Sequence, residues 1–90
     1  MERYLKVLKH EVNSKNGHIA VRVVPIEEDD NGNTRTGSEE IIGIDSEPLK
    51  RDHGDSIESF ILSHKERLMK SLNITEDHHR QLNELKGKRL

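Results

Sequence analysis

Six carboxylates and two asparagines gather in one short stretch of the chain, residues 27–40, which reads EEDDNGNTRTGSEE. Calcium-binding loops of this length place oxygen ligands at alternating positions, a glycine at position 6 and a bidentate glutamate at position 12. With Gly32 at position 6, the earlier ligand positions hold oxygen-bearing side chains, but position 12 holds Ser38. Because the closing carboxylate is missing, a solvated turn between strands is favoured over a cation site.

A loop of this charge can still act through electrostatics. Residues 27–47 carry a net charge of −7, whereas residues 1–26 carry +3 and residues 48–90 carry +2. Complementary charge steers association between protein surfaces and sets their register. We therefore expect the acidic loop, if it has a role, to contact a basic surface on a partner protein. The candidate contact residues are Asp29, Asp30, Glu39 and Glu40.

Histidine is the other metal ligand that recurs in the chain. The six histidines are His10, His18, His53, His64, His78 and His79. No two of them are four residues apart, the spacing that directs two imidazoles at one ion from a single helix. The chain has no cysteine, which removes thiolate zinc sites, disulfides and cysteine nucleophiles. The sequence predicts no metal site and no cofactor.

The segment HGDSIES, residues 53–59, contains the residue types of a hydrolytic triad. A nucleophile, its base and the group that orients the base need a geometry that near neighbours in sequence do not normally form. No oxyanion donors and no converging pair of acids can be identified. Helix capping by Asp55 explains the segment more simply. The sequence therefore predicts that the chain is not an enzyme.

Two predicted helices joined through residues 72–75 allow a helix-turn-helix as an alternative function. In that interpretation the second helix contacts base edges and phosphates of a nucleic acid. The residues for base edges are His79, Arg80 and Asn83, and those for phosphates are Lys86, Lys88 and Arg89. Against it, Glu76 and Asp77 stand at the end of the helix that would approach the phosphates, and no polybasic face is present. A simple pair of helices covering a sheet is favoured.

The elements that position these residues begin with a predicted hairpin. Asn16-Gly17 lies between two apolar segments and suits a two-residue type I′ turn, which needs positive φ at both positions. This turn would place Val12 opposite Val21. Apolar residues farther from the turn fall on the other face, which indicates either a bulge near Pro25 or a sheet covered on both sides.

Residues 1–12 also fit a helix, because apolar residues recur there at the spacing of one helix face. A strand is favoured because of the hairpin that follows. A third strand is predicted over residues 39–45, which are rich in β-branched side chains and bounded by glycine and proline. Residues 1–45 then form an antiparallel meander, with the acidic loop at residues 27–40 joining its second and third strands.

The second half of the chain changes to a helical period. Asp55 is the predicted N-cap of a first helix. Its apolar face contains Ile57, Ile61, His64, Leu68 and Leu72. Thr75 can cap a second helix that ends at Gly87, with Leu82 and Leu85 facing inward. The sequence predicts a helical hairpin over residues 55–86 and a flexible tail at residues 87–90.

The predicted fold class is α+β, with a three-stranded antiparallel β-meander followed by two helices packed on one face, in the order β-β-β-α-α. A chain of 90 residues forms a single domain, residues 1–90. Only 30% of its residues are hydrophobic, so its core must be small. Self-association would bury remaining apolar surface, which makes a homodimer a candidate assembly. No apolar run suits a signal peptide or a membrane span, so a cytoplasmic location without membrane partners is expected.

These exclusions define the functional hypothesis. The sequence favours a small non-enzymatic protein-interaction or regulatory module, with another protein of unknown identity as its partner. Chains of this size and character are common among phage or mobile-element accessory proteins, and such an origin would fit. The alternative is a nucleic-acid-binding regulator that uses the C-terminal pair of helices.

Overall fold

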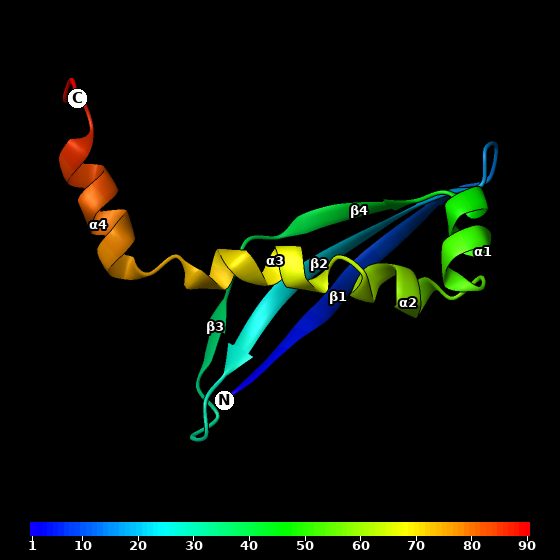
Figure 1. Cartoon of the computed structure of the whole chain (residues 1–90), viewed down its shortest axis with the longest axis horizontal. Coiled ribbons are helices and arrows are strands. Elements are labelled where there is room, and N and C mark those ends of the chain that lie inside the picture. The colour runs from blue at the N-terminus through cyan, green and yellow to red at the C-terminus, as the bar shows by residue number, and fades with distance from the viewer.

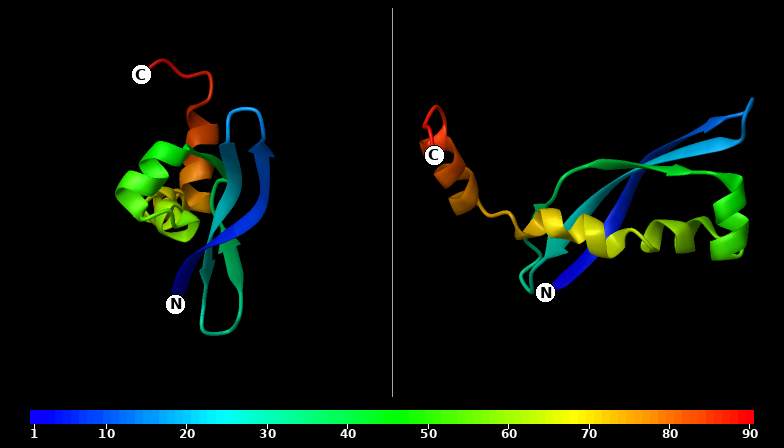
Figure 2. Two further views of the ribbon diagram at one scale, coloured as in Figure 1. Left: turned by 90° about the vertical axis from the view of Figure 1, so that its right-hand side faces the viewer. Right: turned by 45° about the horizontal axis from the view of Figure 1, so that its top comes forward.

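The computed structural model describes residues 1–90 and shows an antiparallel sheet with helices on one side of it (Figure 1, Figure 2). The α+β class and the antiparallel sheet predicted from the sequence are confirmed. The strands are β1 (Glu2–Asn13), β2 (His18–Glu28), β3 (Thr34–Thr36) and β4 (Glu40–Ile44). The helices are α1 (Ser46–His53), α2 (Ile57–Leu62), α3 (Lys65–Met69), the 3-10 helix η1 (Lys70–Asn73) and α4 (Glu76–Leu85).

Strand β2 is the centre of the sheet. The strand predicted over residues 39–45 is confirmed as β4, and β3 is an additional short strand within the predicted acidic loop. β1 pairs with β2 on one edge, whereas β3 and β4 pair with opposite ends of β2 on the other. Between β3 and β4, Gly37 donates its N–H to the Pro25 carbonyl at 2.9 Å. A β-carbon at Gly37 would collide with the side chain of Ser71 in η1. β3 and β4 are separate strands because η1 packs directly against the backbone between them.

The acidic stretch predicted as one loop over residues 27–40 therefore contains a strand. Glu27 lies opposite Arg35 in the β2–β3 pair, and the two side chains form an ion pair at 3.0 Å. Opposite charges directly across two strands stabilise their pairing. Only the segment between β2 and β3 and the segment between β3 and β4 remain outside the sheet.

The β1–β2 hairpin closes through residues 14–17, and the predicted two-residue turn is wrong. Val12 pairs with Ile19, so the predicted register is wrong as well. The carbonyl of Asn13 accepts the N–H of Gly17 at 2.8 Å, which closes the wider turn. Gly17 has a φ of 68°, a conformation that suits glycine because it has no β-carbon.

A β-bulge lies in β1, and not near Pro25 in β2, which was one of the two alternatives that the sequence allowed. The register shifts between Val7 and Lys9, which leaves Leu8 without a partner. Because side chains alternate between the two faces of a strand, one extra residue moves all later side chains to the other face. The strand prediction for residues 1–12 is confirmed, and the helical alternative is wrong.

The hydrophobic core lies between the sheet and the helices. Its buried side chains are Val21, Val23, Ile42, Ile44, Leu49, Phe60, Ile61 and Leu68. Buried residues number 13 of 90, so the core is small, as the composition predicts. The helices gather on one side of the sheet (Figure 2). A core of this size leaves much of the apolar surface outside it.

Helix α1 lies in a segment for which the sequence predicts no helix. It buries Leu49 and ends at Gly54. Gly54 and Asp55 have φ angles of 57° and 64°, which reverse the chain between α1 and α2. Ser56 is the N-cap of α2, because its side chain accepts the N–H of Ser59 at 3.2 Å. The predicted N-cap at Asp55 is wrong, since that residue belongs to the left-handed turn.

The helical hairpin predicted over residues 55–86 does not fold back on itself. α2, α3 and η1 follow one another along the sheet, whereas α4 projects away from it (Figure 1). Thr75 caps α4 as predicted, and an extended backbone at Ile74 and Thr75 directs the helix outward. α4 contains no buried residue, so Leu82 and Leu85 are exposed and do not face inward.

Candidate functional site

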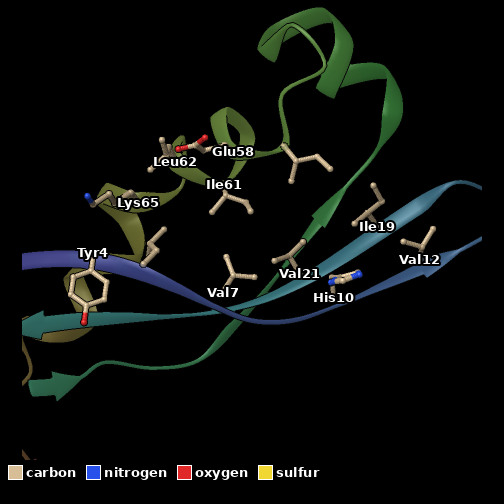
Figure 3. A pocket seen from close by; sticks show the side chains of 12 residues that line it. Tyr4, Val7, His10, Val12, Ile19, Val21, Glu58, Ile61, Leu62 and Lys65 are labelled. Carbon is tan, nitrogen blue, oxygen red and sulfur yellow. The ribbon is translucent and has the colours of Figure 1, made fainter.

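An apolar groove opens between β1 and α2 on the helix-covered face of the sheet (Figure 3). Its volume is about 710 Å³. The two strands form its floor with Leu5, Val7, Val12, Ile19 and Val21, and α2 forms its wall with Ile57, Ile61 and Leu62. We call it the β1–α2 groove. Its size and apolar lining are those of a ligand-binding or partner-binding site.

The bulge at Leu8 builds the floor of this groove. Val7 precedes the bulge and Val12 follows it, and in a regular strand these two side chains would point to opposite faces. Their partners on β2 are Val23 and Ile19, which lie an even number of residues apart and therefore share a face. The bulge joins two apolar halves of β1 in one surface.

The lining of the β1–α2 groove is more exposed than the adjacent core. Val7 is 52% and Val12 is 61% exposed. Across the groove, Ile57 and Leu62 are also exposed, because α2 directs Phe60 and Ile61 into the core in their place. Contiguous apolar surface with a polar rim marks an interaction site in a small domain.

Three lining side chains are of the charged or imidazole type: His10, Glu58 and Lys65. None of them takes part in an ion pair within the chain. The groove has no serine, threonine or cysteine that could act as a nucleophile beside the imidazole. Nowhere in the chain do three or more His, Asp or Glu side chains form a group that could hold a metal ion. The arrangement is suited to binding an apolar surface that the rim charges orient.

β1 is an edge strand whose outer side is unpaired along its 12 residues. Long edge strands can pair with another chain, and lysines and bulges oppose that pairing. β1 contains Lys6 and Lys9 as well as the bulge at Leu8. These features oppose the addition of a partner's strand at this edge, and they favour a partner's helix bound in the groove.

No family model, no curated protein and no solved structure matches the chain. None of its helices combines the length and the apolar character that crossing a membrane requires.

The four acidic residues predicted to contact a partner do not form one surface. Asp29 organises the turn after β2, where its carboxylate accepts the N–H groups of Asn31 and Asn33, both at 2.9 Å. These bonds, led by that from Asn33, hold the pKa of Asp29 below its usual value. Asp30 accepts a hydrogen bond from the N-terminal amine of Met1 at 3.2 Å.

The other two predicted carboxylates lie at the start of β4. Glu39 pairs with Arg22 at 3.3 Å, and Glu40 pairs with Arg67 of α3 at 2.7 Å. Every one of the four predicted carboxylates thus has a donor partner within the chain. This pairing reduces the negative charge that they offer to another protein.

The six residues predicted to contact a nucleic acid lie on α4 or directly after it. They are His79, Arg80, Asn83, Lys86, Lys88 and Arg89, and all are exposed. The guanidinium of Arg80 pairs with Asp77, which also accepts a hydrogen bond from Gln81 at 2.8 Å. Because α4 has no buried residue, α3 and α4 do not make the packed pair that a helix-turn-helix requires.

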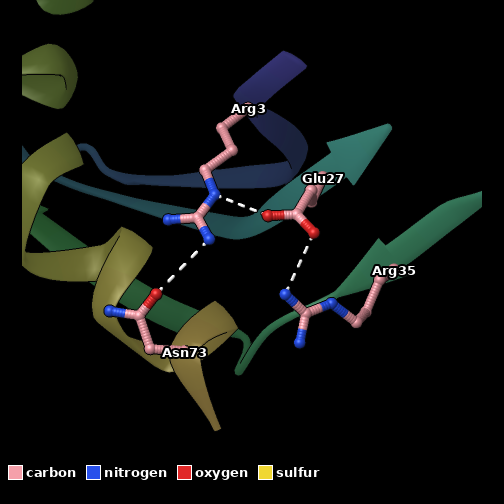
Figure 4. Close-up of polar contacts among 4 residues, drawn as sticks. All are labelled: Arg3, Glu27, Arg35 and Asn73. Carbon is pink, nitrogen blue, oxygen red and sulfur yellow. Dashed lines mark hydrogen bonds and ion pairs between the residues drawn. The ribbon is translucent and has the colours of Figure 1, made fainter. Parts of the chain in front are cut away.

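A polar cluster at one end of the sheet joins three strands to η1 (Figure 4). Glu27 of β2 accepts hydrogen bonds from Arg3 of β1 at 2.6 Å and from Arg35 of β3 at 3.0 Å. Arg3 also donates to Asn73 of η1 at 3.3 Å. The bond from Arg3 and then that from Arg35 lower the pKa of Glu27. The cluster fixes η1 against this end of the sheet.

The β1–α2 groove cannot be recognised from the sequence pattern. With the expected two-residue turn, Val12 and Ile19 fall on one face of the hairpin and Val7 falls on the other. The sequence feature that could have revealed the groove is the spacing of Val7 and Val12, which lie an odd number of residues apart and so would fall on opposite faces of a regular strand. A bulge in either strand is compatible with this spacing, so the pattern alone does not show that it lies at Leu8.

Proposed function

We propose that this chain is a small non-enzymatic protein-interaction module that binds an amphipathic helix of a partner in the β1–α2 groove. The exposed apolar lining of the groove supports the proposal. Each half-exposed Val or Leu that a partner covers contributes about 1 kcal/mol, at about 25 cal/mol per Å² of apolar area removed from water. Amphipathic helices occupy such grooves with apolar residues spaced three or four positions apart.

A second hollow extends the surface that such a helix could cover. It shares Leu62 and Lys65 with the β1–α2 groove and continues along α3 and η1 to Asn73. The combined surface is elongated, which suits a helix better than a compact small molecule. The unpaired charges of Glu58 and Lys65 would set the direction of the bound helix. In this proposal the four acidic residues, which are paired within the chain, make no partner contact.

Two aspartate substitutions provide a matched test. Val12 is 61% exposed in the groove, and Ile41 is 60% exposed on the opposite face of the sheet. The tagged chain and its variants Val12→Asp and Ile41→Asp are used to recover partners from the native host, with quantitative mass spectrometry. We expect the wild type and Ile41→Asp to recover the same partner. Val12→Asp should recover at least about tenfold less, because an unpaired buried charge costs several kcal/mol.

Circular dichroism and thermal unfolding of both variants show whether the fold is kept. Equal recovery of every partner by Val12→Asp and Ile41→Asp would contradict the proposal. If Val12→Asp fails to fold, Leu62→Lys on the α2 wall replaces it, since that side chain is exposed as well.

A further inference from the structure

We infer that the helix which occupies the β1–α2 groove is α4 of a second copy, so that two chains exchange their α4 helices in a symmetric dimer. This inference rests on the proposed function, because it names the partner of the same groove. It begins from two unpartnered apolar surfaces in one chain. The groove is the first of them, and α4 is the second.

α4 has the surface that a groove-binding helix needs. Leu82 is 61% exposed, and Leu85 lies beside it on the same face one turn later. With 100° between successive residues, His78 also falls on this apolar stripe. The acidic residues Glu76 and Glu84 fall on the other side of the helix. The stripe therefore contains no carboxylate.

α4 has a capped first turn but no buried residue within its own chain. Its first turn is a capping box in which the His78 N–H donates to Thr75 Oγ1 at 3.2 Å and the Thr75 N–H donates to His78 Nδ1 at 3.1 Å. Isolated helices of ten residues are marginal in water, and packing of an apolar face normally stabilises them. A preformed helix with an uncovered stripe thus needs a surface to pack on.

The far end of the chain's own groove, around Val12, is out of reach of α4. α4 follows η1 after Ile74 and Thr75, and α3 with η1 has five and four residues. These two elements span about 15 Å, and α4 with its ten residues spans about 15 Å as well. If α4 folded back, Leu82 and Leu85 would stop over α3, before the floor around Val12. The α4 helix of a second copy is not connected to this chain's η1, so its position along the groove is not limited in this way.

Reciprocal exchange accounts for both surfaces at once. In a two-fold dimer each chain supplies one α4 and one groove, so the same contact forms twice. One ten-residue helix buries little area by itself, whereas stable dimers bury about 800 Å² per partner. Two equivalent helix-in-groove contacts double the area. Charge fits as well: Lys86 flanks the stripe of α4, and Glu58 at the rim of the groove has no partner within its own chain.

The first test is the mass of the full chain by sedimentation equilibrium over a range of concentrations. We expect about twice the 10.4 kDa of one chain. Leu82→Asp should shift the mass to that of the monomer, while Asn83→Asp, on the polar side of α4, should keep the dimer. Val12→Asp should also give monomer, and Ile41→Asp should keep the dimer. Circular dichroism of each variant monitors folding.

The second test is complementation between two monomeric variants. Leu82→Asp retains an intact groove, and Val12→Asp retains an intact α4. A mixture of the two restores one of the two helix-in-groove contacts, so we expect a heterodimer that is weaker than the wild-type dimer and that forms at concentrations at which neither variant associates alone. No heterodimer, together with a wild-type dimer that resists Leu82→Asp, would overturn the exchange of α4.

The outcomes separate this inference from the proposed function. A wild-type chain that stays monomeric at all concentrations, but recovers a host partner that Val12→Asp loses, overturns the α4 exchange and leaves the groove as a binding site for another protein. A dimer lost with Leu82→Asp and kept with Asn83→Asp, without any host partner, supports the exchange and removes the heterologous partner from the proposed function.

Discussion

Val7 and Val23 lie directly opposite each other on one face of the sheet, yet Val23 is 0% exposed and Val7 is 52% exposed. The two residues have the same side chain and the same orientation relative to the sheet. Their difference arises because the helical layer covers β2 more completely than the edge strand β1. One face thus has a closed region, which forms the core, and an open region, which forms the β1–α2 groove.

At one end, the closed region is bounded by η1 and by the polar cluster around Glu27. Leu72 of η1 is buried, and the cluster around Glu27 holds η1 in place. In the open region, α2 is short and its Leu62 remains exposed. Apolar residues of equal hydrophobicity are thus buried in the closed region and exposed in the open region.

The largest expected effect separates the two regions by stability. Leu72→Ala leaves a cavity beneath η1 and should lower the free energy of unfolding by about 3 kcal/mol. Leu62→Ala removes an exposed side chain and should lower it by less than about 1 kcal/mol. Urea denaturation followed by circular dichroism measures both. Equal losses would show that the groove belongs to the core.

The second prediction concerns the contact between η1 and Gly37, which lies in the segment that joins β3 to β4. Gly37→Ala places a methyl group against the side chains of Ser71 and Pro25. Overpacking of this kind should cost about 1–3 kcal/mol of unfolding free energy. Ser71→Ala removes one of the colliding atoms, so the double variant should lose less than the sum of the two single variants. Additive losses would contradict the close packing of η1 on this strand.

The third prediction is a pH dependence at the closed region. The pKa of Glu27 is lowered in the folded chain by Arg3 and Arg35, so its carboxylate stabilises the fold above the unfolded pKa of about 4.3. That contribution is lost as the pH falls through the lower folded value. Between about pH 6 and pH 3, the wild type should therefore lose more stability than Glu27→Gln.

Asp29 titrates in the same acidic window, because its pKa is lowered as well. Asp29→Asn is therefore the comparison variant, and the double variant with Glu27→Gln should show the flattest acid dependence. Urea midpoints at a series of pH values measure these slopes. An unchanged slope in Glu27→Gln would show that the cluster contributes nothing to the closed region.

A smaller effect is expected in α4, which lies outside both regions. His78→Ala removes half of the capping box and should destabilise the first turn of α4 by about 0.5–1 kcal/mol. In the monomeric Leu82→Asp background, the urea midpoint of the sheet should not change, because α4 has no buried residue within its own chain. Carbon chemical shifts along α4 measure the local loss, and His79→Ala serves as the neighbouring control. A change in the midpoint as large as that of Leu72→Ala would contradict the independence of α4.

The smallest effect is expected for nucleic-acid binding. We expect no salt-dependent shift of a DNA or RNA probe by the wild type, and therefore no change with Arg80→Ala combined with Lys86→Ala. Arg80 is paired with Asp77, and α4 does not pack into a helix-turn-helix. A wild-type shift that these two substitutions abolish would support the nucleic-acid alternative.

Local chemistry in the sequence was sufficient for several elements. The β-branched residues at 39–45 predict the strand β4, and Thr75 with acidic residues after it predicts the start of α4. Turn chemistry was a less reliable guide. Asn16-Gly17 has the residue types of a two-residue turn, but the hydrogen bond from the Gly17 N–H to the Asn13 carbonyl closes a wider turn. The register followed the actual turn.

The sequence by itself determined the class of the fold, the small size of the core and the amphipathic character of α4, because these depend on composition and on local periodicity. Tertiary structure decided the position of the bulge, the pairing of the acidic residues and the exposure of the groove. Each of these depends on contacts between residues far apart in the chain. Val7 and Val12 illustrate the limit, since only the bulge at Leu8 and the position of α2 place these two strand residues in one apolar groove.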